Sequence, residues 1–281
     1  AATASMDTFL LRLRAIDLDV DGDVPVAAEF DWQISASNWS GSGEVSGSLA
    51  KLQIHHRLAG DYPLSTHGSI ELLNQVQPVF DLVNEFEALN YQQWSASHGR
   101  VSIAGTTDAY RVSLSSSIAN EAAYAAEIAA EIAADALGSL QGLTELELTA
   151  VSDIATLQVA GDIDWLAPSL DLLLTSHGID PSRFAAVPSG ALNAQLRLQA
   201  SSAEEFAVDV ISLSGQWNGQ STTAFGKFSR RDTRWLCSNC RAIVGDNRIN
   251  VNGEIKGSSI FADLELDAPS LQQFWPTLAG S

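Results

Sequence analysis

Apolar and polar residues alternate one by one along much of this chain, most clearly over residues 191–200. Successive side chains of a β-strand point to opposite faces of a sheet, so this pattern predicts strands with one apolar and one polar face. The apolar positions form the candidate site: Leu11, Leu13, Leu146, Leu148, Leu157, Val159, Leu192, Ala194, Leu196, Leu198, Ile249, Val251, Ile255, Ile260, Leu264 and Leu266.

The same alternation predicts strands within 9–20, 24–34, 41–58, 66–73 and 100–114, and almost continuously over 143–281. Short units that open with glycine recur at 43–47, 99–103, 161–165 and 253–257, and we expect these glycines at hairpin turns, which often need a positive φ. Repetition of this kind indicates a sheet extended by adding hairpins in chain order. The predicted fold is therefore mainly β, an antiparallel meander. A short apolar cluster at 271–278 is expected to cap the sheet.

A first helix is predicted over residues 79–89. Val79, Leu82, Val83 and Phe86 have the i, i+3, i+4, i+7 spacing of one helix face. Pro78 fits the first turn of such a helix, where a missing N–H costs nothing.

A second, Ala-rich helix is predicted over residues 117–140, because this segment contains no glycine or proline before Gly138. Glu127, Glu131 and Asp135 would form an acidic stripe on it. We expect this helix to pack on the sheet. The alternative, an amphipathic membrane or partner helix, fits less well because its polar face is acidic rather than basic.

Two domain arrangements fit the pattern: one extended β segment over 1–281, or two halves, 1–116 and 141–281, separated by the helix at 117–140. Five residues precede the only methionine, Met6, and the sequence stops abruptly at Ser281, so a fragment of a longer protein is expected. No run of 18 apolar residues occurs. Any membrane anchor is therefore expected outside this segment.

The chain is acidic, with 34 Asp and Glu against 15 Lys and Arg and a net charge of −19. Such a charge argues against a nucleic-acid partner and against docking on an anionic lipid surface. The hydrophobic fraction of 46% excludes wholesale disorder. Charge says little, however, about a ligand held against an apolar face.

The two cysteines, Cys237 and Cys240, are spaced CxxC. One such pair supplies only two of the four ligands of a structural zinc site, and the flanking residues read as strand rather than as the helix that a redox motif opens. A small structural disulfide across a turn in an oxidising compartment is favoured.

Motifs for catalysis are missing, so neither an enzyme nor a metal or other cofactor is predicted. No HExxH, GxSxG or phosphate-binding loop occurs. His55 and His56 are adjacent on a predicted strand and face opposite ways. Asp17, Asp19, Asp21 and Asp23 alternate as in calcium loops but lack the later Glu, so a solvated acidic turn is favoured over a calcium site.

Several phrases, in their order along the chain, resemble the TamB family. They are Gly161–Trp165 with Leu170–Leu174 and Gly178–Pro181, Leu213–Gly215 with Phe225–Phe228, Gly245–Ile255, and Leu264–Leu271 with Phe274–Gly280. The resemblance is good from about residue 140 to 281 and looser before it.

The resemblance implies a periplasmic segment of an AsmA-like bridge protein of Gram-negative bacteria, anchored in the inner membrane. It implies a long curled sheet, a β-taco groove with an apolar interior, that conducts phospholipids toward the outer membrane. A TamA-like outer-membrane barrel is the implied partner, reached through regions outside this segment. The family has no catalytic residues to carry over.

Two other functions stay open. In a structural scaffold, or an assembly factor for outer-membrane proteins or autotransporters, the apolar face would be filled by its own side chains. A right-handed β-helical carbohydrate enzyme would need clustered acids on one face, which the sequence does not reveal.

Overall fold

The structure is a computed structural model that describes residues 9–18, 25–34, 38–48, 50–72, 77–92, 94–120, 128–183, 186–202, 204–257 and 259–275. The chain forms two compact units. The first contains Ala1–Asn120 and Ile132–Leu140, and the second contains Glu121–Glu131 and Gln141–Ser281.

The first unit is an antiparallel meander in which each strand from β1 to β8 pairs with the next one along the chain. Most of a ninth strand, β9 (Ile128–Gly138), also belongs to this unit. The strands are β1 (Phe9–Leu18), β2 (Pro25–Ile34), β3 (Ser40–Ser48), β4 (Leu52–Ala59), β5 (Leu64–Glu71), β6 (Val79–Tyr91), β7 (Trp94–Thr106) and β8 (Tyr110–Asn120).

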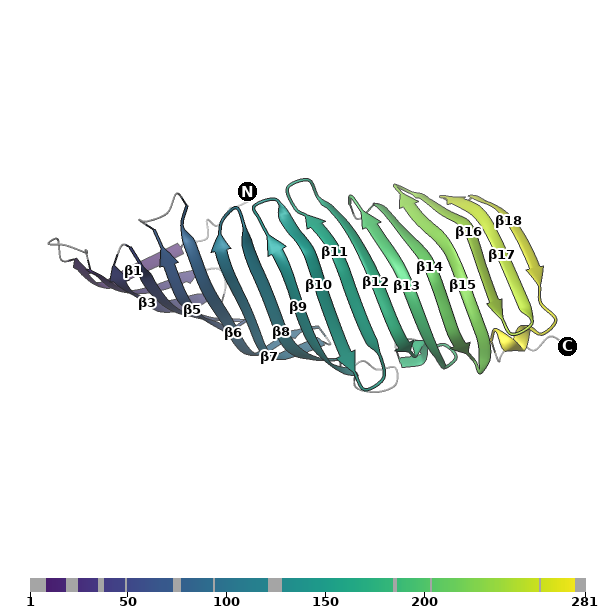
Figure 1. The fold of residues 1–281 in the computed structure, drawn as a ribbon, viewed down its shortest axis with the longest axis horizontal. Helices are drawn as coiled ribbons and strands as arrows, with labels where there is room; N and C mark the ends of the chain where they lie inside the picture. The colour runs from purple at the N-terminus through teal and green to yellow at the C-terminus, as the bar shows by residue number, and fades with distance from the viewer. Residues whose placement is uncertain are drawn as a thin grey trace, which may run out of the picture. The chain divides into compact units, whose positions relative to one another are not determined.

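The second unit is also an antiparallel meander, and Figure 1 shows its strands side by side in chain order. Its strands are β10 (Gly142–Ser152), β11 (Thr156–Asp164), β12 (Ser169–Ile179), β13 (Gly190–Ala200), β14 (Glu205–Trp217), β15 (Gln220–Arg231), β16 (Arg234–Val244), β17 (Asn247–Lys256) and β18 (Ser259–Asp267). Two 3-10 turns, η1 (Pro181–Arg183) and η2 (Leu271–Gln273), complete its described elements. The prediction of a mainly β antiparallel meander is confirmed.

The predicted Ala-rich helix at 117–140 is wrong. Its first residues end strand β8, and residues 128–138 form strand β9. The reason lies in the spacing: acids at i, i+4 and i+8 share a face in a helix and equally in a strand, because four is a multiple of two. In β9, Glu131, Ala133 and Asp135 are exposed, whereas Ala136 is buried. Pairing with the sheet therefore overrides the helix propensity of alanine.

The predicted helix at 79–89 is also wrong, since strand β6 covers this segment. β6 hydrogen-bonds to β5 on one side and to β7 on the other. Leu82 and Phe86 then lie on one face, and Val79 and Val83 on the other. A propensity estimate from one isolated segment does not include the backbone hydrogen bonds of two neighbouring strands.

The glycines that open the repeated units lie inside strands rather than at hairpin turns, so that expectation is wrong as well. Gly161 lies in β11 with φ +148°, and a Cβ there would stand 2.0 Å from the carbonyl oxygen of Asp171 on β12. Glycine is needed at this position because two backbones approach too closely for a side chain.

β-Bulges interrupt the ladders of the second unit. The register shifts between Leu143 and Leu146 on β10 and between Cys237 and Cys240 on β16. Glu145 and Asn239, within these shifts, have φ of 51° and 52°. A bulge bends its strand and increases the local twist, so bends are built into the sheet at these positions.

Side-chain hydrogen bonds join segments along one rim of the second unit. This rim comprises the turns after β12, β14 and β16 and the segment after β18. At its centre, Asn247 is 0% exposed. Its Nδ2 donates to Val244 O (3.0 Å) and Gln273 Oε1 (2.7 Å), and its Oδ1 accepts from Ser270 N (2.9 Å). Trp217 Nε1 donates to Phe274 O at 2.7 Å. The residues after β18 therefore close this hydrogen-bonded rim.

Replacing Asn247 by alanine is expected to lower the free energy of unfolding by about 1–3 kcal/mol, because buried partners would lose their hydrogen bonds. Urea unfolding followed by circular dichroism measures the change. The matched control is Asn250→Ala, whose amide donates to Glu265 on the exposed surface, and which should change the value by about 0.5 kcal/mol or less. Equal losses in the two variants would contradict the assigned role of Asn247.

Candidate functional site

Strand register joins the apolar positions of the second unit into one surface. Residues paired across an antiparallel ladder lie on the same face, and Leu172, Leu198, Val208 and Phe228 form one such row over four strands. The apolar face comprises Leu146, Leu148, Leu157, Val159, Leu170, Leu172, Leu174, Leu192, Ala194, Leu196, Leu198, Phe206, Val208, Val210, Leu213, Ala224, Phe228, Trp235, Cys237, Ala242, Ile249, Val251, Ile255, Ile260, Ala262, Leu264 and Leu266.

This face is open to solvent rather than packed as a core. Among the described residues of the whole chain, only four apolar side chains are buried: Ala136, Leu192, Cys240 and Val244. Ile260, Leu264 and Leu266 on β18 are 70%, 63% and 51% exposed. Monomeric soluble proteins rarely expose contiguous apolar patches of this kind unless the patch binds something.

Two hollows indent the apolar face along its second rim, at the turns after β11, β13, β15 and β17. The first, of about 620 Å³, is lined by Ile163, Trp165, Leu170, Leu198 and Phe206, among others. The second, of about 480 Å³, is lined by Phe228, Trp235, Val251, Ile255 and Ile260, among others. Because Trp165, Phe206 and Trp235 line these hollows, this edge is called the aromatic rim.

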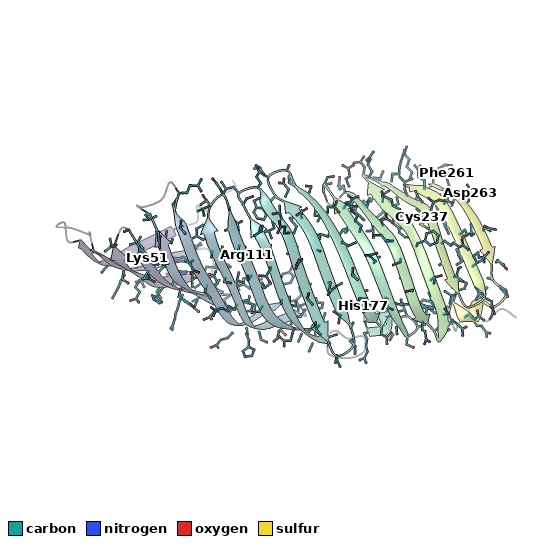
Figure 2. All side chains as sticks on the ribbon, in the orientation of Figure 1. Lys51, Arg111, His177, Cys237, Phe261 and Asp263 are labelled. Carbon is teal, nitrogen blue, oxygen red and sulfur yellow. A yellow bond between two sulfur atoms is a disulfide. The ribbon has the colours of Figure 1, made fainter. Side chains whose placement is uncertain are left out.

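The opposite face carries the charges. Arg197 pairs with Asp171 at 2.6 Å, Arg231 with Glu205 at 3.0 Å, and Arg234 with Glu254 at 2.9 Å. Hydrogen bonds from Arg197 and then from Gln199 lower the pKa of Asp171 to about 2. This polar face can therefore stay in water. Figure 2 draws the side chains of both faces on the ribbon and labels Cys237 of the apolar face and Asp263 of the polar face.

Fourteen of the sixteen predicted site residues lie together on the apolar face of the second unit. Leu11 and Leu13 instead lie on β1 of the first unit, where the register pairs them with Trp32 and Phe30, and their side chains lie outside the described residues. Among the residues that the prediction omitted are Leu170, Leu172, Leu174, Phe206, Phe228 and Trp235. The alternation of β12 and β14 could have revealed the leucines of β12 and Phe206 of β14. The bulge on β15 disguises the pattern around Phe228.

In the first unit, one histidine side chain lies against aromatic side chains of a neighbouring part of the sheet. His56 on β4 stacks on Phe30 and Trp32 of β2, with ring centroids 5.9 and 6.0 Å apart. β3 lies between these strands, and glycines at 41 and 43 leave room for the contact, since a Cβ on Gly41 would stand 2.3 Å from Trp32 Nε1. Trp32 Nε1 donates to His56 Nε2 at 3.0 Å. Desolvation lowers the pKa of His56.

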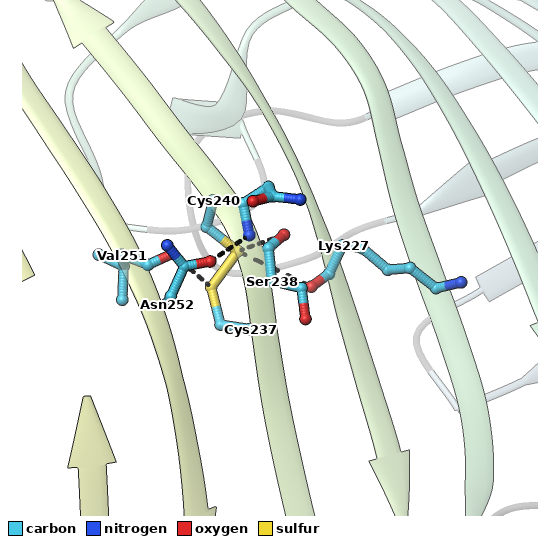
Figure 3. The surroundings of a disulfide bond; sticks show 7 residues. Lys227, Cys237, Ser238, Cys240, Val251 and Asn252 are labelled. Atoms are coloured by element: carbon cyan, nitrogen blue, oxygen red, sulfur yellow. Dashed lines mark hydrogen bonds between the residues drawn. A yellow bond between two sulfur atoms is a disulfide. The ribbon is translucent and has the colours of Figure 1, made fainter. Parts of the chain in front are cut away.

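Cys237 and Cys240 form a disulfide on the apolar side of β16 (Figure 3). It joins the two ends of the β-bulge rather than crossing a turn, which differs from the expected placement. Within the bulge, Asn239 N donates to Asn252 Oδ1 at 2.6 Å. The cross-link therefore fixes the bend of β16 beside the second hollow.

The described residues contain no group of three His, Cys, Asp or Glu side chains placed to hold a metal ion. Asp19, Asp21 and Asp23, which belong to the segment of alternating aspartates, lie outside the described residues. In the part of the chain that the structure describes, no helix has the length and apolar character that a membrane crossing requires.

Comparison with known proteins identifies one family. The family model described as TamB, N-terminal domain, matches residues 5–281. No curated protein and no solved structure matches the chain.

The lowered pKa of His56 predicts a pH dependence of stability. Because folding disfavours the protonated imidazole, its contribution is complete above the ordinary pKa of 6.5 and is lost as the pH falls through the folded-state pKa. Urea unfolding at neutral and at acidic pH should therefore show a larger loss in the wild type than in His56→Gln, which keeps an acceptor for Trp32. An equal loss in both proteins would refute this assignment.

Proposed function

The chain belongs to the TamB family, matching its N-terminal domain over residues 5–281, and from this premise we propose that its apolar face binds phospholipid acyl chains and conducts them between the inner and outer membranes. Family membership links the chain to the translocation and assembly module. Proteins of this family span the periplasm. The lipid cargo and the path along the apolar face are the proposal.

The observation that carries this proposal is the uncovered apolar face. Burying a methylene group away from water gains about 0.8 kcal/mol, so a 16-carbon chain could gain on the order of 10 kcal/mol before its entropy losses. Side chains such as Leu264, which is 63% exposed, can contribute their free surface to that gain. Such a face binds an aliphatic chain best, because an aliphatic chain needs no hydrogen bonds.

Continuity of the face supports movement as well as binding. Apolar rows run across several neighbouring strands, for example from Leu174 through Leu196 to Val210. With a strand spacing of about 4.8 Å, the nine strands of the second unit extend over about 38 Å. An acyl chain that moves across the strands exchanges one aliphatic neighbour for another, so no large barrier separates successive positions.

The remaining parts of the proposal concern location and partners. The segment acts in the periplasm, as part of a protein anchored in the inner membrane by residues outside it. A TamA-like outer-membrane barrel is its partner, also reached through other regions. The polar face, with its ion pairs, is then the surface in contact with the aqueous periplasm.

A second candidate function is a scaffold that assists assembly of outer-membrane proteins or autotransporters. Strand β18 favours it, because all its residues are exposed and its described pairing is to β17 alone. An unpaired strand edge can add a strand from another chain. This function would use the edge, whereas lipid binding uses the face, so variants can separate the two.

Leu196→Asp tests the lipid proposal, because it places a charge on the apolar face between Leu174 and Val210. We expect co-purified phospholipid, measured by native mass spectrometry of the whole chain, to fall about tenfold or more. An unpaired carboxylate against an acyl chain costs well over the roughly 1.4 kcal/mol that corresponds to a factor of ten.

The matched control is Gln195→Asp, which adds the same charge one residue away on the polar face. It should leave the phospholipid content within about a factor of two, because the new carboxylate lies on the face that does not contact the acyl chains. Circular dichroism checks that both variants fold. Unchanged lipid content in Leu196→Asp, or no lipid in the wild type, would rule the proposal out.

A further inference from the structure

One cation interrupts the apolar face at the aromatic rim. Arg230, near the end of β15, is paired by register with Phe206 on β14 and with Trp235 on β16. Both partners belong to the apolar face, so Arg230 lies on that face as well, whereas its neighbour Arg231 is paired with Glu205 on the polar face. An arginine does not contribute to an apolar surface, so its presence at this position needs another explanation.

Two of the contacts of the Arg230 side chain show how it lies at the rim. Its guanidinium carbon lies 5.5 Å from the centroid of the Trp235 ring. Its Nε donates to the carbonyl oxygen of Asp232, in the turn after β15, at 3.0 Å. Phe206 and Trp235 also meet edge to face, with centroids 5.7 Å apart. The cation therefore stands on an aromatic support at the edge of the sheet.

Apolar hollows lie on either side of this cation. Phe206 lines the hollow of about 620 Å³, and Trp235 lines the hollow of about 480 Å³. A third hollow, of about 670 Å³, is lined by Phe206 and Arg230 but mainly by residues of the polar face, such as Lys227, Glu205 and Arg231. On the apolar face, Arg230 thus stands between two apolar hollows.

Basic residues are concentrated in the part of the chain that contains Arg230. Seven of the 15 Lys and Arg residues lie between 227 and 256, in a chain with a net charge of −19. The register places the other six on the polar face, where Arg231 and Arg234 pair with acids. Arg230 is the member of this group on the apolar face, and it can attract an anion there although the chain as a whole repels one. A planar guanidinium matches the oxygens of a phosphate group in particular.

We propose that Arg230 binds the phosphate of a glycerophospholipid at the aromatic rim, while the two acyl chains of the lipid enter the hollows on either side. This inference rests on the proposed function and deepens it, because it names the headgroup chemistry and the point at which a lipid is held. The aromatic rings of Phe206 and Trp235 then contact the glycerol region, between the charged and the aliphatic parts of the ligand.

Binding of two short-chain lipids to the whole chain tests the proposal. Dihexanoyl-phosphatidylglycerol carries the phosphate, and dihexanoylglycerol has the same acyl chains without it. Calorimetry should show that Arg230→Gln weakens binding of the first about tenfold to a hundredfold, as expected for loss of a charged hydrogen bond. Binding of the second should change less than about twofold.

Two further variants act as controls. Arg248→Gln removes the same charge from β17 on the opposite face, where Arg248 is paired with Asp267, and should bind both lipids like the wild type. Arg230→Lys keeps the charge and should retain part of the preference for the phosphate lipid. High salt should weaken phosphatidylglycerol binding to the wild type more than to Arg230→Gln.

The possible results separate this inference from the function on which it rests. Equal weakening of both lipids by Arg230→Gln would mean that Arg230 only supports the rim, and unchanged phosphatidylglycerol binding would mean that it contacts no phosphate. Either result overturns the inference but leaves acyl-chain binding intact. Failure of the wild type to bind either lipid would overturn both.

Two other occupants of the rim are tested in the same series. If inorganic phosphate binds as tightly as the phosphate lipid and depends equally on Arg230, the site takes free phosphate and the lipid assignment fails. Light scattering reports a second copy of the chain. A lipid-independent dimer that Arg230→Gln dissociates would assign the rim to that copy and overturn the proposal.

Discussion

The register of the antiparallel ladders is the constraint on which the rest of the structure depends. Each strand of the second unit pairs with the next so that its aliphatic side chains meet those of its neighbour, as Leu172 meets Leu198 and Leu198 meets Val208. A slip of one residue in any ladder would turn the aliphatic side chains of the following strand into the polar face. The glycines and bulges serve this constraint, since they allow close backbone approach and bending while the faces remain separate.

A single-layered sheet of this kind does not derive its stability from a large buried core. Its strands are held by backbone hydrogen bonds and by neighbours on the same face, and few described side chains are buried. Among the described residues of the second unit, the buried polar side chains are Ser176, Thr222 and Asn247, and they lie toward the hydrogen-bonded rim. That rim is built of amides, and the opposite rim carries aromatic and basic side chains. The two edges of the same sheet thus differ in chemistry.

The motifs behind the family resemblance have a structural explanation. Asn247, within the Gly245–Ile255 phrase, fastens the segment after β18 to the sheet. Asp180, within Gly178–Pro181, accepts hydrogen bonds from Gly190 N at 3.0 Å and from Ser182 Oγ at 2.8 Å, and so shapes the loop after β12. These residues build the edge of the sheet. The family model, which matches nearly the whole chain, agrees with a shared architecture of this kind.

The sequence by itself determined the strands with strict alternation, the apolar face of β13 and β17, and the absence of a familiar catalytic motif, because a period of two is a local property of the chain. It could not decide the segments at 79–89 and 117–140, where spacings of three and four fit a helix and only pairing with neighbouring strands selects β6 and β9. Nor could it place Arg230 between Phe206 and Trp235, or bring His56 to Trp32 across β3. Those contacts join residues that are distant along the chain, and the register that unites them arises only when the sheet forms.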